Sequence, residues 1–232
     1  RETAATLALL DAAAATAQRT GAIGAVGIRH TTPADIDAMG IVGLGAQGTW
    51  QAIAACAARP IRTVYFLARS DASADRFLAA VVPRVSKVRF VRCADGAELL
   101  RSAPLIITAT SAAAPVLPDD PALLAGHHFI AIGSYKADMQ ELPDAAFRLA
   151  GAILVDSDIA IEESGDVAGP VARGIVQRSQ VRHIAEVAAG QHAVDTSRTT
   201  VFKSVGMALY DLCAARAFLA AAERAGRGVT FG

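Results

Sequence analysis

The chain has 232 residues, of which 53% are hydrophobic, and its 22 basic and 22 acidic side chains give a formal net charge of zero. This length suffices for one large domain with a substantial core, and the neutral balance gives no electrostatic reason to expect a nucleic acid or an anionic membrane as partner. Asp11, Gln18 and Arg19 interrupt the alanine-rich start, so no apolar run of about 18 residues is present. The start also lacks the pattern of a signal peptide, so we expect a cytoplasmic protein.

The N-terminal segment favours a helix, because Thr3 to Gln18 is rich in alanine and leucine. Gly21, Gly24 and Gly27 follow at short intervals, and we expect them to end this helix. The polar, proline-containing segment from His30 to Asp37 is expected to be a surface loop.

From residue 40 onward, short apolar segments alternate with segments of helical pattern. Such alternation is typical of a parallel sheet covered on both faces, so we predict an α/β fold with a doubly wound parallel sheet. The expected helices are 49–58, 72–82 and 94–101, and the expected strands are 40–42, 63–67, 88–91, 105–108, 129–132 and 153–155. We expect the last of these strands to end the sheet.

Apolar residues recur at helical spacing between Val205 and Ala222, which predicts one long C-terminal helix. Because this helix follows the expected end of the sheet, we expect it to pack elsewhere, against a further segment or a partner subunit. The chain begins with Arg1 inside a helical pattern, which favours a fragment of a longer protein. Such a fragment is expected to aggregate through the exposed stripe.

Residues 39–51, MGIVGLGAQGTWQ, place three glycines at G-x-G-x-x-G spacing between a predicted strand and a predicted helix. Gly43 would permit a tight turn, Gly45 would let a pyrophosphate approach the backbone, and Gly48 would let the helix pack closely. The following helix would offer free N–H groups and a partial positive charge to the phosphates. The context predicts dinucleotide binding by a Rossmann domain.

The residues after the second predicted strand bear on the choice of dinucleotide. An NAD site usually has Asp or Glu there, about 20 residues past the glycines, whereas this chain has Arg69 and Ser70. A guanidinium can pair with the 2′-phosphate of NADP, and residues 67–70 (LARS) contain no carboxylate that would repel it. We therefore favour NADP(H). NAD(H) stays possible if Arg69 is only a solvated loop residue.

Several longer stretches occur in a fixed order along the chain: RETAA at 1–5, GLGAQG at 43–48, TATS at 108–111, GSYKADMQELP at 133–143, VDS at 155–157, ESGD at 163–166 and TVFKSVGMALYDL at 200–212. Through them the chain resembles the ornithine cyclodeaminase/mu-crystallin family. The resemblance implies that an N-terminal portion is absent and that the protein is a homodimer. It also implies three parts: a helix joining a dimerisation lobe (1–20), a Rossmann NAD(P)-binding domain (21–180), and a return segment with a C-terminal helix that packs on that lobe (181–232).

The resemblance further implies the site residues. Arg1 would bind the substrate carboxylate, and Val205 would close over the ring and substrate. The cofactor would be bound by Gly43, Gly45, Ala46, Gln47, Gly48, Arg69, Ser70, Thr108, Thr110, Ser111, Ile132, Gly133, Ser134 and Ser204.

One departure from the family bears on the reaction. Where the cyclodeaminases and the archaeal alanine dehydrogenases of the family have an Asp that handles protons, this chain has Tyr135, and Met139 replaces a lysine. A tyrosine, with a pKa near 10, is a poor base but can donate a proton to an imine nitrogen. This favours reduction of Δ1-pyrroline-2-carboxylate or Δ1-piperideine-2-carboxylate to L-proline or L-pipecolate, with Tyr135 as the candidate catalytic residue. Ornithine cyclodeamination, an alanine-type dehydrogenase and a non-catalytic NADPH-binding protein remain alternatives.

The remaining polar clusters suggest no metal site. His127 and His128 lack Cys or carboxylate partners at ligand spacing. Glu162, Glu163 and Asp166 form an acidic cluster that we expect to border the active site. The expected ligand is a small cyclic imino acid or amino acid, with neither nucleic acid nor membrane as partner.

Overall fold

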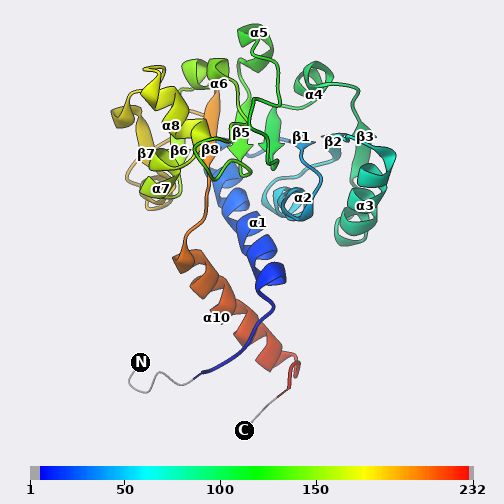
Figure 1. The fold of residues 1–232 in the computed structure, drawn as a ribbon. Helices are drawn as coiled ribbons and strands as arrows, with labels where there is room; N and C mark the ends of the chain where they lie inside the picture. The colour runs from blue at the N-terminus through cyan, green and yellow to red at the C-terminus, as the bar shows by residue number, and fades with distance from the viewer. Residues whose placement is uncertain (1–5, 230–232) are drawn as a thin grey trace.

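The computed structural model describes residues 6–229 and shows one parallel sheet in the order β3-β2-β1-β4-β5-β8-β6-β7 (Figure 1). The α/β fold with a parallel sheet is therefore confirmed. The described strands are β1 (Ala38–Val42), β2 (Thr63–Leu67), β3 (Arg89–Arg92), β4 (Leu105–Thr108), β5 (His128–Ala131), β6 (Ala152–Val155), β7 (Val181–His183) and β8 (Thr200–Lys203).

Helices connect these strands and cover both faces of the sheet. Two short 3-10 helices, η1 (Val82–Arg84) and η2 (Arg178–Gln180), accompany them. The α-helices are α1 (Ala12–Thr31), α2 (Ala46–Ala58), α3 (Asp71–Val81), α4 (Gly96–Ser102), α5 (Pro121–Leu124), α6 (Asp144–Leu149), α7 (Asp158–Glu162), α8 (Gly165–Ala172), α9 (Ile184–Ala188) and α10 (Ala208–Arg224).

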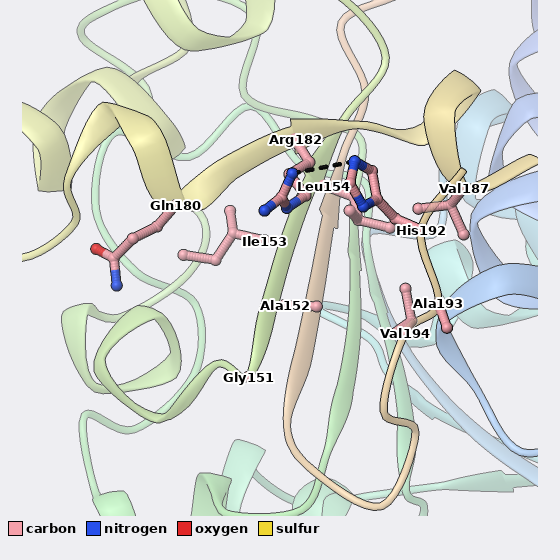
Figure 2. Close-up of a pocket in the computed structure, with 10 residues that line it drawn as sticks. All are labelled: Gly151, Ala152, Ile153, Leu154, Gln180, Arg182, Val187, His192, Ala193 and Val194. Carbon is pink, nitrogen blue, oxygen red and sulfur yellow. Dashed lines mark hydrogen bonds between the residues drawn. The ribbon is translucent and has the colours of Figure 1, made fainter. Parts of the chain in front are cut away.

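The prediction that the strand at 153–155 ends the sheet was wrong. β7 and β8 follow it in the chain, and β8 lies between β5 and β6, where Val201 and Phe202 are fully buried. The four-residue β8 was overlooked because its apolar pair is followed at once by a charged residue, Lys203. A cavity of about 200 Å³ lies beside β6 and the edge strand β7, with Arg182 and His192 in its wall (Figure 2).

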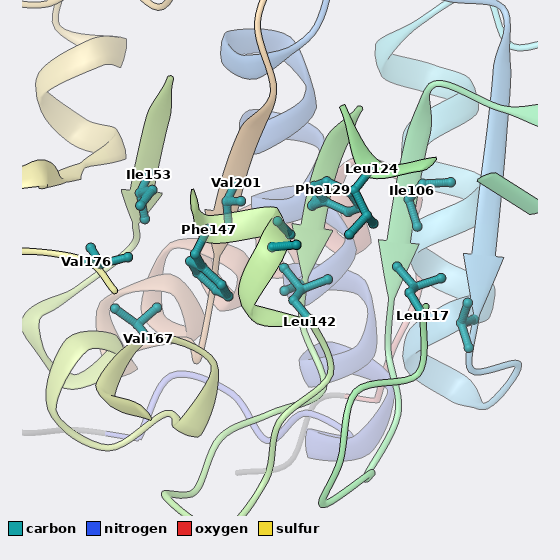
Figure 3. Close-up of a cluster of buried hydrophobic side chains, with 14 of the residues drawn as sticks. Ile106, Leu117, Leu124, Phe129, Leu142, Phe147, Ile153, Val167, Val176 and Val201 are labelled. Carbon is teal, nitrogen blue, oxygen red and sulfur yellow. The ribbon is translucent and has the colours of Figure 1, made fainter. Parts of the chain in front are cut away.

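Alternating strand residues build one core on each face of the sheet. In β4, Leu105 and Ile107 pack with α1, α2 and α3, whereas Ile106 faces the core of α4, α5 and α6. Phe129 and Val201 of neighbouring strands join Ile106 on that face (Figure 3). Both faces being buried explains why the strands read as continuous apolar runs.

The three glycines near the start do not end the first helix, so this expectation was also wrong. α1 runs through all of them because each is a close-approach position. A Cβ at Gly21 would lie 2.8 Å from the Trp50 carbonyl oxygen, and a Cβ at Gly24 or Gly27 would collide with Gln51 or Phe202. The tight packing of α1 on α2 and β8 outweighs the low helix propensity of glycine.

α10 is the predicted C-terminal helix, and it projects away from the sheet beside α1 (Figure 1). Arg19 Nε donates to Asp211 Oδ1 at 2.8 Å and joins the two helices, while Leu209 and Leu212 are each 58% exposed. The division into 1–20, 21–180 and 181–232 stays a prediction. Within the described residues, no helix is long and apolar enough to cross a membrane.

Candidate functional site

The carboxyl ends of the central strands lie side by side, and backbone hydrogen bonds continue past them. Ala109 N donates to the Val42 carbonyl at 2.8 Å, and Ile132 N to the Thr108 carbonyl at 2.9 Å. Ser204 N likewise donates to the Ala131 carbonyl at 3.1 Å. The predicted residues after β1, β4, β5 and β8 therefore meet at one edge, where parallel α/β sheets bind ligands.

The glycine motif forms the turn between β1 and α2. Gly43 has a φ of +99°, and a Cβ there would collide with the Ala109 carbonyl. A Cβ at Gly48 would collide with the carbonyl oxygen of Gly43, so this glycine lets α2 start close against the turn. A Cβ at Gly45, by contrast, would meet no atom of another segment within 4 Å, which leaves space over the backbone.

The N-terminus of α2 faces this open space with its first N–H groups uncapped by a side chain, since Gly45 is the N-cap. Two buried side-chain oxygens nearby, Gln47 Oε1 and Thr108 Oγ1, have no hydrogen-bond partner among the described residues. Uncapped N–H groups, a partial positive charge and a glycine with free space fit the pyrophosphate of a dinucleotide.

The end of β2 carries the residues that bear on the 2′-position of a ribose. Arg69 is exposed, and Ser70 caps α3 by accepting from Ser73 N at 3.3 Å. Arg92, at the end of β3, donates to the Ala68 carbonyl at 3.2 Å and pairs with Asp71. Two guanidinium groups thus lie at the loop where a 2′-phosphate would be expected.

The loop after β5 carries Tyr135, which is 55% exposed. The Lys136 ammonium lies 5.6 Å from the Tyr135 ring centroid, and both Lys136 and Asp138 are exposed. Ser134 is fully buried, and its hydroxyl donates to the Met139 carbonyl at 2.7 Å. The tyrosine is therefore displayed on a loop whose base is fixed.

Glu141 holds the start of the Tyr135 loop in place. It was not among the site residues predicted from the sequence. Its carboxylate accepts from Thr110 N and Gly133 N, each at 2.6 Å, and from Ser134 N at 3.3 Å. Burial raises the pKa of Glu141, and nearby Lys203 opposes that rise. The only sequence signal was its place within GSYKADMQELP, where an acid ahead of Leu-Pro reads as a loop charge.

Asp166 and Lys203 complete this buried group. Asp166 Oδ1 accepts from Glu141 N at 2.7 Å and from Leu142 N at 3.0 Å, and Lys203 Nζ lies 3.2 Å from Asp166 Oδ2. The expected acidic cluster is thus divided, because Glu162 and Glu163 are exposed while Asp166 is buried.

Asp156, at the end of β6, holds the loop that carries Ser204 and Val205. Its carboxylate accepts from Ser204 Oγ at 2.6 Å, Val205 N at 3.3 Å and Gly206 N at 2.7 Å. Tyr210 of α10 donates to the Asp156 carbonyl at 3.4 Å, and burial raises the pKa of Tyr210 to about 12. Asp156 was not predicted as a site residue, although it belongs to the VDS stretch at 155–157.

The remaining predicted site residues differ in their exposure to solvent. Ile132 is buried, Thr110 is half-buried, and Ala46 and Ser111 are exposed. Arg1 lies outside the described residues.

The two neighbouring histidines form hydrogen-bond contacts within the protein. His128 Nδ1 contacts Thr200 Oγ1 at 3.0 Å, and His127 Nε2 contacts the Leu100 carbonyl at 2.8 Å. The cavity beside β7 is separate from this edge.

The family model of the ornithine cyclodeaminase/mu-crystallin family matches residues 1–225. The chain belongs to this family. Two curated relatives agree with the match. A Δ1-pyrroline-2-carboxylate reductase of Bacillus cereus is 34% identical over 214 residues, 90% of this chain and 65% of that protein. The ketimine reductase mu-crystallin of Mus musculus is 30% identical over 211 residues, 90% of this chain and 63% of that protein.

Among solved structures, the Δ1-pyrroline-2-carboxylate reductase of Thermococcus litoralis in complex with NADH and L-proline has the same fold. Its TM-score is 0.89 at 27% identity, and the match covers 99% of this chain and 71% of that one. The chain spans less than two thirds of the length of the two curated relatives.

Proposed function

We propose that the protein containing this chain is an NAD(P)H-dependent reductase of cyclic ketimine amino acids. Δ1-Pyrroline-2-carboxylate or Δ1-piperideine-2-carboxylate would be reduced to L-proline or L-pipecolate. The observation that carries the proposal is the similarity, over nearly the whole chain, to a reductase solved with NADH and L-proline. The open glycine turn and the uncapped α2 support it, because they fit a dinucleotide.

In this proposal the cofactor, when bound, supplies the hydride that reduces the C=N carbon, and the chain supplies orientation. Gly43, Gly45 and Gly48 bring the backbone and the α2 N-terminus to the pyrophosphate, helped by Ala46 and Gln47. Thr108, Thr110 and Ser111 would follow the ribose at the end of β4. Ile132, Gly133, Ser134 and Ser204 would line the nicotinamide end.

The substrate side of the proposal rests on three residues. Tyr135 would give a proton to the imine nitrogen, directly or through a water, and Val205 would close over the ring. Arg1 would bind the substrate carboxylate. Replacement of the family's Asp by Tyr135 disfavours cyclodeamination, which needs a base near neutral pH.

We also propose NADP(H) as the preferred cofactor, because Arg69 is exposed at the end of β2 and no carboxylate immediately follows that strand. A homodimer is proposed as the working form. Leu209 and Leu212 on α10 leave apolar surface that a second copy would cover.

The test follows the absorbance of NADPH and of NADH, in separate assays of the full-length protein, with Δ1-pyrroline-2-carboxylate as substrate. Oxidation of NADPH by the imine, with ornithine plus NAD⁺ inert in a parallel assay, is the expected result. Ammonia release from ornithine would instead establish cyclodeamination. Tight NADPH binding without turnover of Δ1-pyrroline-2-carboxylate, or of Δ1-piperideine-2-carboxylate in a repeat of the assay, would instead establish a binding protein.

A further inference from the structure

Three charged side chains from separate elements form one buried cluster beneath the candidate site. Glu141 precedes α6, Asp166 lies in α8, and Lys203 ends β8; each has 0% exposed surface. Buried charges are costly unless they are paired or hydrogen-bonded, so a cluster retained here needs a reason. None of the three takes part in the proposed reaction.

The contacts of Glu141 show what the cluster holds. One carboxylate oxygen accepts from Thr110 N, in the loop after β4, and the other from Gly133 N and Ser134 N, in the loop after β5. A single side chain thus joins the two loops that follow the central strands. Gly133 must be a glycine for this, because a Cβ there would collide with Thr110 and approach Glu141 Oε1 at 2.6 Å.

The rest of the cluster holds Glu141 itself. Asp166 accepts from the backbone N–H groups of Glu141 and Leu142, and Lys203 faces the other Asp166 oxygen. Lys203 is also next to Ser204, whose N–H extends the ladder from β5. Lys203 therefore stabilises Asp166, Asp166 positions Glu141, and Glu141 positions both loops.

We infer that Glu141 is a positioning residue for the dinucleotide: its ionised carboxylate sets the β4 and β5 loops at the distance that the nicotinamide half of the cofactor requires, and the Asp166–Lys203 pair holds it there. This inference rests on the proposed function, since it assumes that the dinucleotide binds at this edge. A protonated carboxyl would lose acceptor capacity toward three N–H donors, so the arrangement depends on the ionised form.

Proton uptake by Glu141 makes the inference testable. The groups facing its carboxylate are Lys203 from β8, Asp166 from α8, and the backbone N–H groups of Thr110, Gly133 and Ser134 from the β4 and β5 ends. Burial and Asp166 raise the pKa of Glu141, and Lys203 lowers it. Cofactor affinity is therefore expected to fall with decreasing pH. The fall should begin at a higher pH than the pH at which an exposed glutamate takes up a proton.

The experiment measures the Kd of NADH by fluorescence titration across the acidic to neutral range, in full-length wild type and Glu141→Gln. NADH is the probe because it lacks the 2′-phosphate, whose own titration would overlap. We expect wild-type affinity to fall with decreasing pH while circular dichroism stays native. Glu141→Gln should bind about tenfold more weakly at neutral pH and show a flattened profile. Lys203→Met should move the wild-type midpoint to higher pH.

Phe77→Leu is the control for destabilisation alone, because Phe77 is a buried residue of α3 that packs against Phe66 of β2 and Phe90 of β3, away from the β4 and β5 loops. It should lower thermal stability and leave the Kd and its pH profile unchanged. A wild-type profile that is flat while the protein stays folded overturns the inference, as does wild-type affinity and pH dependence in Glu141→Gln. Failure of wild type to bind either NADH or NADPH instead contradicts the proposed function.

Discussion

Lys203 Nζ lies 3.2 Å from Asp166 Oδ2, and neither side chain has any exposed surface. The pair joins β8, the strand inserted between β5 and β6, to α8 on one face of the sheet. Buried pairs of this kind contribute less than their Coulomb attraction suggests, because both charges lose their hydration. Removing one partner, however, leaves an uncompensated charge in the interior.

Lys203→Met is therefore expected to lower the free energy of unfolding by about 3–5 kcal/mol. Asp166→Asn should also destabilise the protein, and the double variant should lose less than the sum of the two single losses. Denaturant unfolding of the four proteins measures this cycle. Strictly additive losses would show that the two charges do not interact.

Gly45→Ala is expected to weaken cofactor binding without destabilising the fold. The added methyl group meets no atom of another segment within 4 Å, and the φ of −77° suits alanine, so thermal stability should stay within about 0.5 kcal/mol of wild type. The methyl occupies the space proposed for the pyrophosphate, so the Kd of NADPH should rise at least about tenfold. Isothermal titration calorimetry and thermal unfolding measure the two effects.

Gly48→Ala provides the contrast within the same motif. Its Cβ would collide with the Gly43 carbonyl, so both stability and binding should fall. Unchanged NADPH affinity in Gly45→Ala would mean that the pyrophosphate does not pass over this glycine.

Arg69→Ala tests the cofactor preference. Loss of a charge-assisted contact to a 2′-phosphate should raise the Kd of NADPH about tenfold to a hundredfold and leave the Kd of NADH unchanged. Arg62→Ala is the matched control, since Arg62 is an exposed arginine just before β2, at the opposite end of that strand. Equal weakening of both dinucleotides by Arg69→Ala would argue against a phosphate contact.

Tyr135→Phe tests the proton donor. Removing the hydroxyl should lower kcat for imine reduction about tenfold to a hundredfold, while NADPH affinity stays the same because the exposed ring is kept. Asp138→Asn, an exposed change in the same loop, is the control. An unchanged kcat in Tyr135→Phe would mean that a water molecule or another group, and not Tyr135, donates the proton.

The sequence was sufficient for the parts of the fold that local pattern determines. The strands at 63–67 and 105–108 match β2 and β4 residue for residue, β2 because it is rich in β-branched and aromatic residues and β4 because a fully buried parallel strand is a continuous apolar run. The glycine turn was readable from local spacing between a strand and a helix, and Gly48 does meet the Gly43 carbonyl within the same βαβ unit, whereas the neighbour of Gly43, Ala109, comes from the distant loop after β4.

The wrong or missing predictions concern residues whose structure is determined by contacts with segments far away in the sequence. Gly24 and Gly27 lie inside a helix because Gln51 and Phe202 pack against them, and no local pattern reports those partners. Glu141 read as a loop charge because its donors, Thr110 and Gly133, are brought to it only by the sheet. The spacing of residues along the sequence gives no signal for a buried charge cluster whose members come from distant segments.

A final prediction concerns His128, which is buried at the start of β5. The Thr200 hydroxyl donates to the Thr31 carbonyl at 2.9 Å, so its oxygen accepts from His128 Nδ1–H at 3.0 Å, which fits a neutral ring. Burial and neighbouring His127 lower the pKa of His128 to about 4. In the unfolded chain the pKa returns to about 6.5.

Between these two values the unfolded chain binds a proton that the folded protein does not. Stability contributed by neutral His128 is therefore complete above about pH 6.5 and is lost as the pH falls toward 4, by up to about 3 kcal/mol. His128→Asn keeps an N–H donor near the Nδ1 position but cannot titrate, so its stability should fall less steeply over this range. Denaturant unfolding at several pH values compares it with wild type and with His192→Asn, which changes an exposed histidine and should retain the wild-type slope. Equal slopes in wild type and His128→Asn would show that His128 does not cause the acid sensitivity.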